Sequence, residues 1–245
     1  MTVLRIVVLI ALALVLALPA GRGDAAASDR VPFVACASDG QAGPRPGPKD
    51  SGHAPAVAPS LAGKLAYYAS ADLSVLAPRG WHCIGLYGSN GATLVVTPEA
   101  HQAADVLKPN FHLTGPAVEL SLSLGSTSGR FEVAQVAARL FPSQRAFVQR
   151  IIAEGIEPAS DFPFGPYPAD KLTRRSNTDV EFQTPAHADG MGTTSFLAKN
   201  ASPISGVAIM TARGDLVVVD VRTPPGSSDV TASVVAQTRA ASSSL

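Results

Sequence analysis

The chain has 245 residues, with 19 basic and 19 acidic side chains, and therefore carries no formal net charge. Only 16% of the residues are charged, and no basic stripe or mixture of aromatic and basic residues occurs, which argues against a nucleic-acid-binding surface. Small residues take the place of the charged ones, and clear strand patterns exclude an intrinsically disordered chain. We expect an exported protein in which one hydrophobic core fills the mature part.

The first 27 residues have the pattern of a secretory signal peptide, which predicts a periplasmic or secreted protein. Arg5 supplies the positive charge, Ile6–Leu18 is an apolar run, and Ala25–Ala27 offers the small residues that a signal peptidase needs. That run is shorter than the roughly 20 residues of a membrane span, so we expect no span after cleavage. Two alternatives are an uncleaved anchor and a lipoprotein acylated at Cys36.

The two cysteines of an exported chain predict one disulfide, between Cys36 and Cys83. It would tie an N-terminal arm to a strand over Trp81–Tyr87. The alternative is Cys83 as a nucleophile with His82 as its base. Adjacent residues of a strand point to opposite faces, so these two side chains cannot meet if that strand forms.

Residues 28–59 are predicted to be an N-terminal arm, and residues 60–245 a single domain. Proline and glycine are frequent in Ala37–Pro59 and oppose regular structure there. Ser60 is predicted to cap a short helix. The helix would place three side chains on one face, those of Leu61, Leu65 and Tyr68.

Three apolar runs separated by turn residues predict an antiparallel meander, over Leu73–Ala77, Trp81–Tyr87 and Ala92–Thr97. In the middle strand, side chains alternate between two faces. One face would hold Trp81, Cys83 and Tyr87, and the other His82, Ile84 and Leu86.

Farther along the chain, the pattern predicts further strands and helices. Ala117–Leu124 alternates, with Val118, Leu120, Leu122 and Leu124 on one face and Glu119, Ser121 and Ser123 on the other. Helices are expected over 130–141 and 144–154, strands over 171–184, a hairpin over 204–221 and a helix from residue 228. This order predicts an α+β fold, a mainly antiparallel sheet with helices packed on it.

The C-terminal third resembles a known family in the order of its elements. The segments VEFQTPA, SGVAIM and LVVVDVRTP with a closing helix, within residues 179–240, are similar to the second half of PsbP-like domains. The resemblance implies an α/β/α sandwich, no catalytic residue, and a role in binding or stabilising partners. The whole chain also resembles uncharacterised exported proteins of high-GC bacteria.

The loop Glu157–Ala169 is the predicted binding surface, because prolines stiffen it around three aromatic rings. The predicted binding residues are Phe162, Phe164 and Tyr167. Aromatic rings on a stiff loop lose little entropy when a partner covers them. The alternative is that these rings fold back over the core.

Signals for catalysis are weak in this sequence. His101 and Asp105 would lie one helical turn apart, which suits a catalytic histidine or a metal, or a plain surface ion pair. The loop Gly125–Gly129 resembles a nucleophile elbow but has Thr127 at its centre, and a Gly/Ser loop before a helix could also cradle an anion. We expect no catalytic residue, no metal and no cofactor.

The sequence therefore favours an exported, non-catalytic binding or accessory protein of the bacterial envelope. Its partner would be an envelope protein or a small molecule. One alternative is a small hydrolase or transferase whose site is assembled from dispersed residues. The candidates for that site are His101, His112, His187, Ser128 and Asp105. A self-associating envelope protein is a further alternative.

Overall fold

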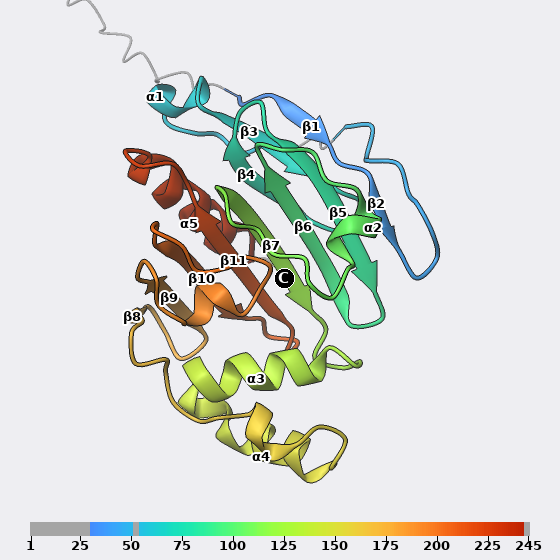
Figure 1. Ribbon diagram of the computed structural model, residues 1–245, viewed down its shortest axis with the longest axis vertical. Coiled ribbons are helices and arrows are strands. Elements are labelled where there is room, and N and C mark those ends of the chain that lie inside the picture. Colours follow the sequence, from blue (N-terminus) through green and yellow to red (C-terminus); the bar gives the residue numbers. More distant parts are fainter. Residues whose placement is uncertain (1–29, 51–53, 243–245) are drawn as a thin grey trace, which may run out of the picture.

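Two β-sheets form the framework of the computed structural model, which describes residues 30–50 and 54–242 (Figure 1). The large sheet has the strand order β2-β5-β6-β7-β11-β10-β9-β8, and its neighbours are antiparallel except for β2 and β5. The small sheet has the order β1-β3-β4. With helices packed on these sheets, the predicted α+β fold with a mainly antiparallel sheet is confirmed.

The elements have the following bounds. The large sheet contains β2 (Ser38–Gly40), β5 (His82–Gly88), β6 (Gly91–Thr97), β7 (Ala117–Ser123), β8 (Lys171–Arg174), β9 (Asp179–Thr184), β10 (Ile204–Met210) and β11 (Leu216–Arg222). The small sheet contains β1 (Phe33–Ala35), β3 (Leu65–Ala69) and β4 (Ser74–Pro78). The helices are α1 (Pro59–Ala62), α2 (Ala103–Val106), α3 (Arg130–Leu140), α4 (Arg145–Ala153) and α5 (Ser228–Ser242). None of these helices, within the described residues, has the length and apolar character needed to cross a bilayer.

One face of the large sheet packs under the small sheet and α5. Alternate residues of the central strands, such as Leu120 on β7 and Val219 on β11, contribute to this core together with Tyr68 and Val234. The predicted alternation of β7 is confirmed. Because strand side chains alternate, the intervening residues of β7 and β11 point to the opposite face.

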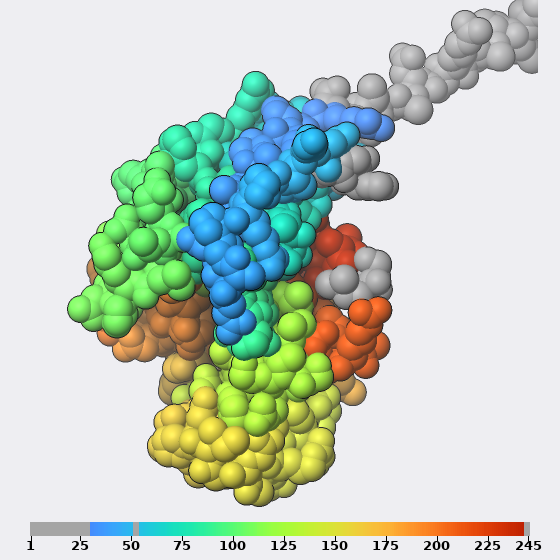
Figure 2. Space-filling model, turned by 90° about the vertical axis from the view of Figure 1, so that its right-hand side faces the viewer, coloured from blue at the N-terminus to red at the C-terminus, as the bar shows by residue number. Residues whose placement is uncertain are grey.

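The opposite face of the large sheet is covered in separate patches. Helices α3 and α4 pack over one end, with Val133 and Val148 fully buried there. Helix α2 and two loop segments cover another part, where Leu113 and Leu197 are buried. Figure 2 shows α3 and α4 projecting at one end of the molecule, away from the segment around α2. The central strands between these patches are the place where a cavity can form.

The predicted three-strand meander is only partly correct. Strands β5 and β6 form the expected hairpin, but β4 pairs with β3 in the other sheet. The hydroxyl of Tyr68 donates to the carbonyl of Pro78 at 2.8 Å and accepts the N–H of Trp81 at 3.0 Å. These bonds fix the corner between β4 and β5, so the chain passes from one sheet to the other there.

The predicted helix capped by Ser60 is wrong at its start and beyond its first turn. Its N-cap is Ala58, so Ser60 lies inside the helix. Helix α1 ends at Ala62, and Leu65–Ala69 forms strand β3, in which all five residues are buried. Burial on both sides removes the polar alternation that would have identified a strand. Pairing with β4 decides the conformation.

The N-terminal arm has more regular structure than its composition suggests. Strand β1 pairs in parallel with β3, and β2 pairs in parallel with β5. Figure 2 shows this segment lying along the body of the protein. The predicted signal peptide, residues 1–27, lies outside the described residues.

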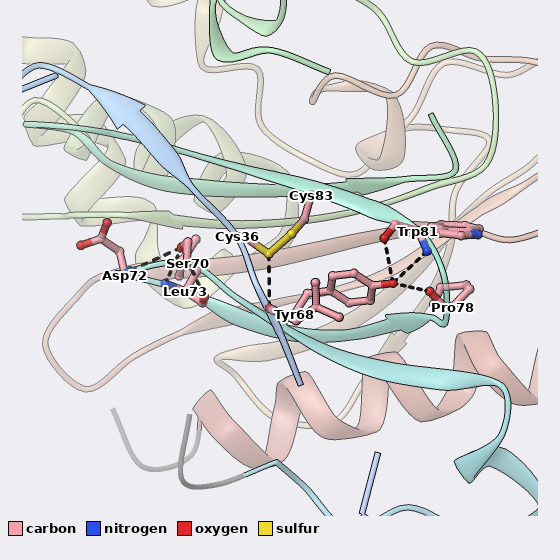
Figure 3. Close-up of a disulfide and its surroundings, with 9 residues drawn as sticks. Cys36, Tyr68, Ser70, Asp72, Leu73, Pro78, Trp81 and Cys83 are labelled. Atoms are coloured by element: carbon pink, nitrogen blue, oxygen red, sulfur yellow. Dashed lines mark hydrogen bonds between the residues drawn. A yellow bond between two sulfur atoms is a disulfide. The ribbon is translucent and has the colours of Figure 1, made fainter. Parts of the chain in front are cut away.

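The predicted disulfide between Cys36 and Cys83 is present (Figure 3). It joins the segment between β1 and β2 to strand β5, with Cα atoms 5.4 Å apart. Because both sulfur atoms are in this bond, neither the catalytic thiol nor the acylated Cys36 is compatible with the structure. The bond anchors the N-terminal segment to the large sheet.

Candidate ligand-binding cavity

A cavity of about 480 Å³ lies on the face of the large sheet that points away from α5. Its floor is formed by residues of β6, β7 and β11, and helix α3 and the segment around Ser195 contribute walls. A cavity of this volume is within the range of small-molecule sites. It was not predicted from the sequence.

Two acidic residues lie on the floor. Glu119 and Asp220 are directly opposite each other in the antiparallel pairing of β7 and β11. They are 4% and 3% exposed, so both carboxyl groups are inside the protein. Their neighbours on the floor are Ser121 and Val218, which are themselves register partners.

The two carboxyl groups have few hydrogen-bond donors. The backbone N–H of Phe196 donates to Glu119 Oε2 at 3.1 Å. Ser195 also interacts with both carboxyl groups. Asp220 Oδ1 is buried and has no hydrogen-bond partner within the described part of the chain.

Burial raises the pKa of both acids. Desolvation raises the pKa of Glu119 to about 7, and hydrogen bonds from Phe196 and Ser195 oppose the rise. Desolvation also raises the pKa of Asp220 well above its usual range, and the negative charges of Glu119 and Asp170 add to this effect. The two groups therefore resist carrying two negative charges at neutral pH.

Helix α3 supplies a wall through Glu132, Gln135, Val136 and Arg139. Its opposite side is apolar at helical spacing and packs into the core, which leaves these residues toward the cavity. Asn90 in the β5–β6 turn donates to Glu132 Oε1 at 3.1 Å. Glu132 Oε2 is buried with no hydrogen-bond partner among the described residues.

The segment that carries Ser195 is held in place by Asp170. This carboxylate accepts the N–H of Met191 at 2.9 Å and the hydroxyl of Thr184 at 2.7 Å. Thr184 Oγ1 in turn accepts the N–H of Gly192 at 3.0 Å. The Gly-rich segment is thereby fixed against β9, so this wall of the cavity has a defined position.

A buried arginine clamps the two loops next to the floor. Arg222, 1% exposed, lies two residues after Asp220 on β11. Its guanidinium group donates to the backbone carbonyls of Leu113, Gly115 and Ala198. It joins loops that are far apart in the sequence.

The predicted binding residues occupy three different environments. Phe162 is 2% exposed and belongs to the core under α3 and α4. Phe164 is 41% exposed, with the guanidinium of Arg145 4.3 Å from its ring centroid. Tyr167 is half-buried and lines the cavity, with Arg139 4.1 Å from its ring centroid. The three rings therefore do not form one exposed patch.

The residues proposed for a dispersed catalytic site do not line the cavity. His101 stacks edge-on against Phe111, and Asp105 forms an ion pair with Lys108 at 2.6 Å. The lining of the cavity also does not include His112, His187 or Ser128. Within the described residues, no group of three or more His, Cys, Asp or Glu is arranged to hold a metal ion.

The sequence predicts that Glu119 lies on the polar face of its strand, but it does not predict a role for this residue. The missed signal was that two strongly hydrophobic strands each carry an acidic residue, Glu119 and Asp220, although strand interiors disfavour acids. Comparison with known proteins supplies no further guidance, because no family model, curated protein or solved structure matches this chain.

Proposed function

We propose that this protein is an exported, non-catalytic binding protein of the bacterial envelope that holds a small molecule in the cavity above β7 and β11. The observation that supports this most strongly is the buried pair Glu119 and Asp220. Removing two carboxyl groups from water is costly, and apolar residues of similar volume would usually stabilise a core as well or better. Acids with raised pKa values in a cavity are typical of functional sites.

The composition of the lining also supports ligand binding. The lining contains apolar residues such as Leu216 and Val218 together with the hydroxyl groups of Ser121 and Ser195. Small-molecule sites commonly combine an apolar surface with a few convergent polar groups, which set the orientation of the ligand.

Export is supported by two independent features. The disulfide between Cys36 and Cys83 is of the kind that forms in oxidising compartments, because the cytosol keeps thiols reduced. The pattern of Arg5, Ile6–Leu18 and Ala25–Ala27 is that of a cleavable signal. We propose the periplasm or the medium as the location.

The test is native mass spectrometry of the protein purified without denaturation from the envelope fraction of its own host. We expect a bound small molecule on the wild type. Ser121→Leu, which fills the floor, should remove it, while Thr173→Leu on the exposed edge strand β8 should not. Equal ligand-free masses for all three proteins, or an occupancy that Ser121→Leu leaves unchanged, would contradict the proposal.

A further inference from the structure

The charges around the cavity are unbalanced. Among the described residues that line it, four have carboxyl groups: Glu119, Glu132, Asp161 and Asp220. The basic side chain in this lining is that of Arg139, which donates to the carbonyl of Gly165 at 3.2 Å and stacks on Tyr167. A cationic group is therefore the electrostatic complement of the cavity.

Two carboxyl oxygens in this lining have no hydrogen-bond partner among the described residues. Asp220 Oδ1 is on the floor and Glu132 Oε2 is on the wall, and both are buried without a partner among the described residues. Buried polar atoms of folded proteins nearly always have a partner, so each exception requires an explanation. A ligand that brings N–H donors would supply the missing bonds.

We infer that the ligand carries a primary ammonium group, which lies on the floor against Glu119 and Asp220. This inference rests on the proposed binding function and names the chemical class of the ligand. A primary ammonium is compact and has three donors, which suits a floor whose two acids are only 4% and 3% exposed. A quaternary ammonium has no N–H donor to offer the unpartnered oxygen of Asp220.

The rest of the ligand is expected to be aliphatic. The lining next to the floor includes Val136, Met191, Leu216 and Val218. These side chains offer contact surface to a short hydrocarbon chain, which would follow the ammonium group out toward α3. An alkylamine is therefore the simplest probe of the site.

The experiment is isothermal titration of the full mature protein at pH 8 and low ionic strength with n-pentylamine. Pentan-1-ol is the neutral analogue, choline the bulky cation, and CaCl2 the test for a metal. We expect pentylamine to bind about tenfold or more tightly than pentan-1-ol, since a charged hydrogen bond is lost in the alcohol. Choline and Ca²⁺ should bind weakly.

The double variant Glu119→Gln/Asp220→Asn keeps the shape of the floor and removes its charge, and should weaken pentylamine about tenfold or more. Glu132→Gln tests the wall separately, and should weaken pentylamine by a smaller factor. Asp189→Asn removes a surface carboxylate that pairs with Lys199 and does not line the cavity, and is the control that should bind like the wild type. Circular dichroism confirms that each variant is folded.

The inference is overturned if pentan-1-ol binds as tightly as pentylamine, or if the double variant retains the affinity for the amine. Ca²⁺ binding that the double variant abolishes would reassign the floor to a metal ion. If pentylamine fails but Ser121→Leu still releases a natural ligand, only the amine inference falls. If Ser121→Leu also changes no occupancy, the proposed function falls with it.

Discussion

Glu119 on β7 and Asp220 on β11 are register partners, so two carboxyl groups face each other across the centre of the large sheet. Like charges in directly opposed positions destabilise a sheet, and burial increases the cost. A proton kept on at least one of the two acids reduces this cost. The stability of the fold therefore depends on the protonation of this pair, and so does the charge on the floor of the cavity.

Replacing Glu119 by Gln should change how stability depends on pH. The pKa of Glu119 is about 7 in the folded protein against an ordinary 4.5, so the folded state holds the proton longer than the unfolded state. Stability from this group is therefore fully present below pH 4.5 and is lost as pH rises through about 7. The groups that face it are Asp220, Ser195 and the N–H of Phe196, and the charge of Asp170 acts on Asp220.

The loss amounts to about 3 kcal/mol over this range. The free energy of unfolding of Glu119→Gln should therefore rise by about 3 kcal/mol relative to that of the wild type between pH 4.5 and pH 8, as measured by urea unfolding. Glu99→Gln, on the exposed segment after β6, is the matched control. A stability difference between Glu119→Gln and the wild type that stays constant across this range would contradict the prediction.

Arg222→Met should destabilise the protein strongly. The backbone carbonyls of Gly115 and Ala198 lose the donor that Arg222 supplies, and the carbonyl of Leu113 keeps only the N–H of Ala198. An unsatisfied buried group costs about 1–3 kcal/mol, so we expect a loss of roughly 2–3 kcal/mol in urea unfolding. Hydrogen exchange should also speed up at the amide of Ala198, which pairs with Leu113 at 3.0 Å.

The control for that change is Arg213→Met, in the exposed turn between β10 and β11, which should cost well under about 1 kcal/mol. An equal loss of stability in Arg222→Met and Arg213→Met would show that the hydrogen bonds of Arg222 do not stabilise the fold. Faster exchange confined to Arg222→Met would assign the effect to the two loops that it joins.

Much of the fold could be predicted from the sequence because local signals agreed with the tertiary structure. The alternation of Val118, Leu120 and Leu122 defined the faces of β7, and the Arg213–Gly214 turn defined the β10–β11 hairpin. Helix α3 followed from its apolar spacing. In each case, one short stretch of chain contains the whole signal.

The errors arose where distant contacts decide the structure. Leu65–Ala69 is apolar throughout, so its conformation depends on pairing with β4, and the path from β4 to β5 depends on the hydroxyl of Tyr68. The cavity is a stronger case, because Glu119 and Asp220 are 101 positions apart in the numbering and meet only through the register of β7 and β11. No local pattern encodes that register.

Removing the disulfide should lower stability without changing the fold. Cys36 and Cys83 are separated by 47 positions. Closing a loop of that length lowers the entropy of the unfolded chain, which can stabilise the folded protein by about 4 kcal/mol at most. Cys83→Ser should be destabilised about as much as the double variant Cys36→Ser/Cys83→Ser, because either change breaks the bond. Thermal unfolding under non-reducing conditions measures this.

The matching control is the wild type with a reducing agent, which should unfold like the double variant. A double variant as stable as the oxidised wild type would contradict the prediction. It would mean that the pairing of β2 with β5 holds the N-terminal segment by itself.

The aromatic loop gives the last prediction, a contrast between two phenylalanines two positions apart. Phe162 is 2% exposed and packs in the core, so Phe162→Ala should cost about 3–5 kcal/mol. Phe164 is 41% exposed and contacts Arg145, so Phe164→Ala should cost about 0.5 kcal/mol or less. Urea unfolding of the two variants measures the difference.

The same contrast decides whether Phe164 is available to a partner. If Phe164→Ala is nearly as stable as the wild type, the ring is free to serve as the anchor that the proline-stiffened loop predicts. Crosslinking of the protein to a partner in the intact envelope should then be lost in the variant. Arg145→Gln, which removes the cation over the ring and keeps the ring itself, separates the role of the charge from that of the aromatic surface. A loss of 3 kcal/mol or more for Phe164→Ala, comparable to that of a buried ring, would assign Phe164 to the core and leave the loop without an exposed anchor.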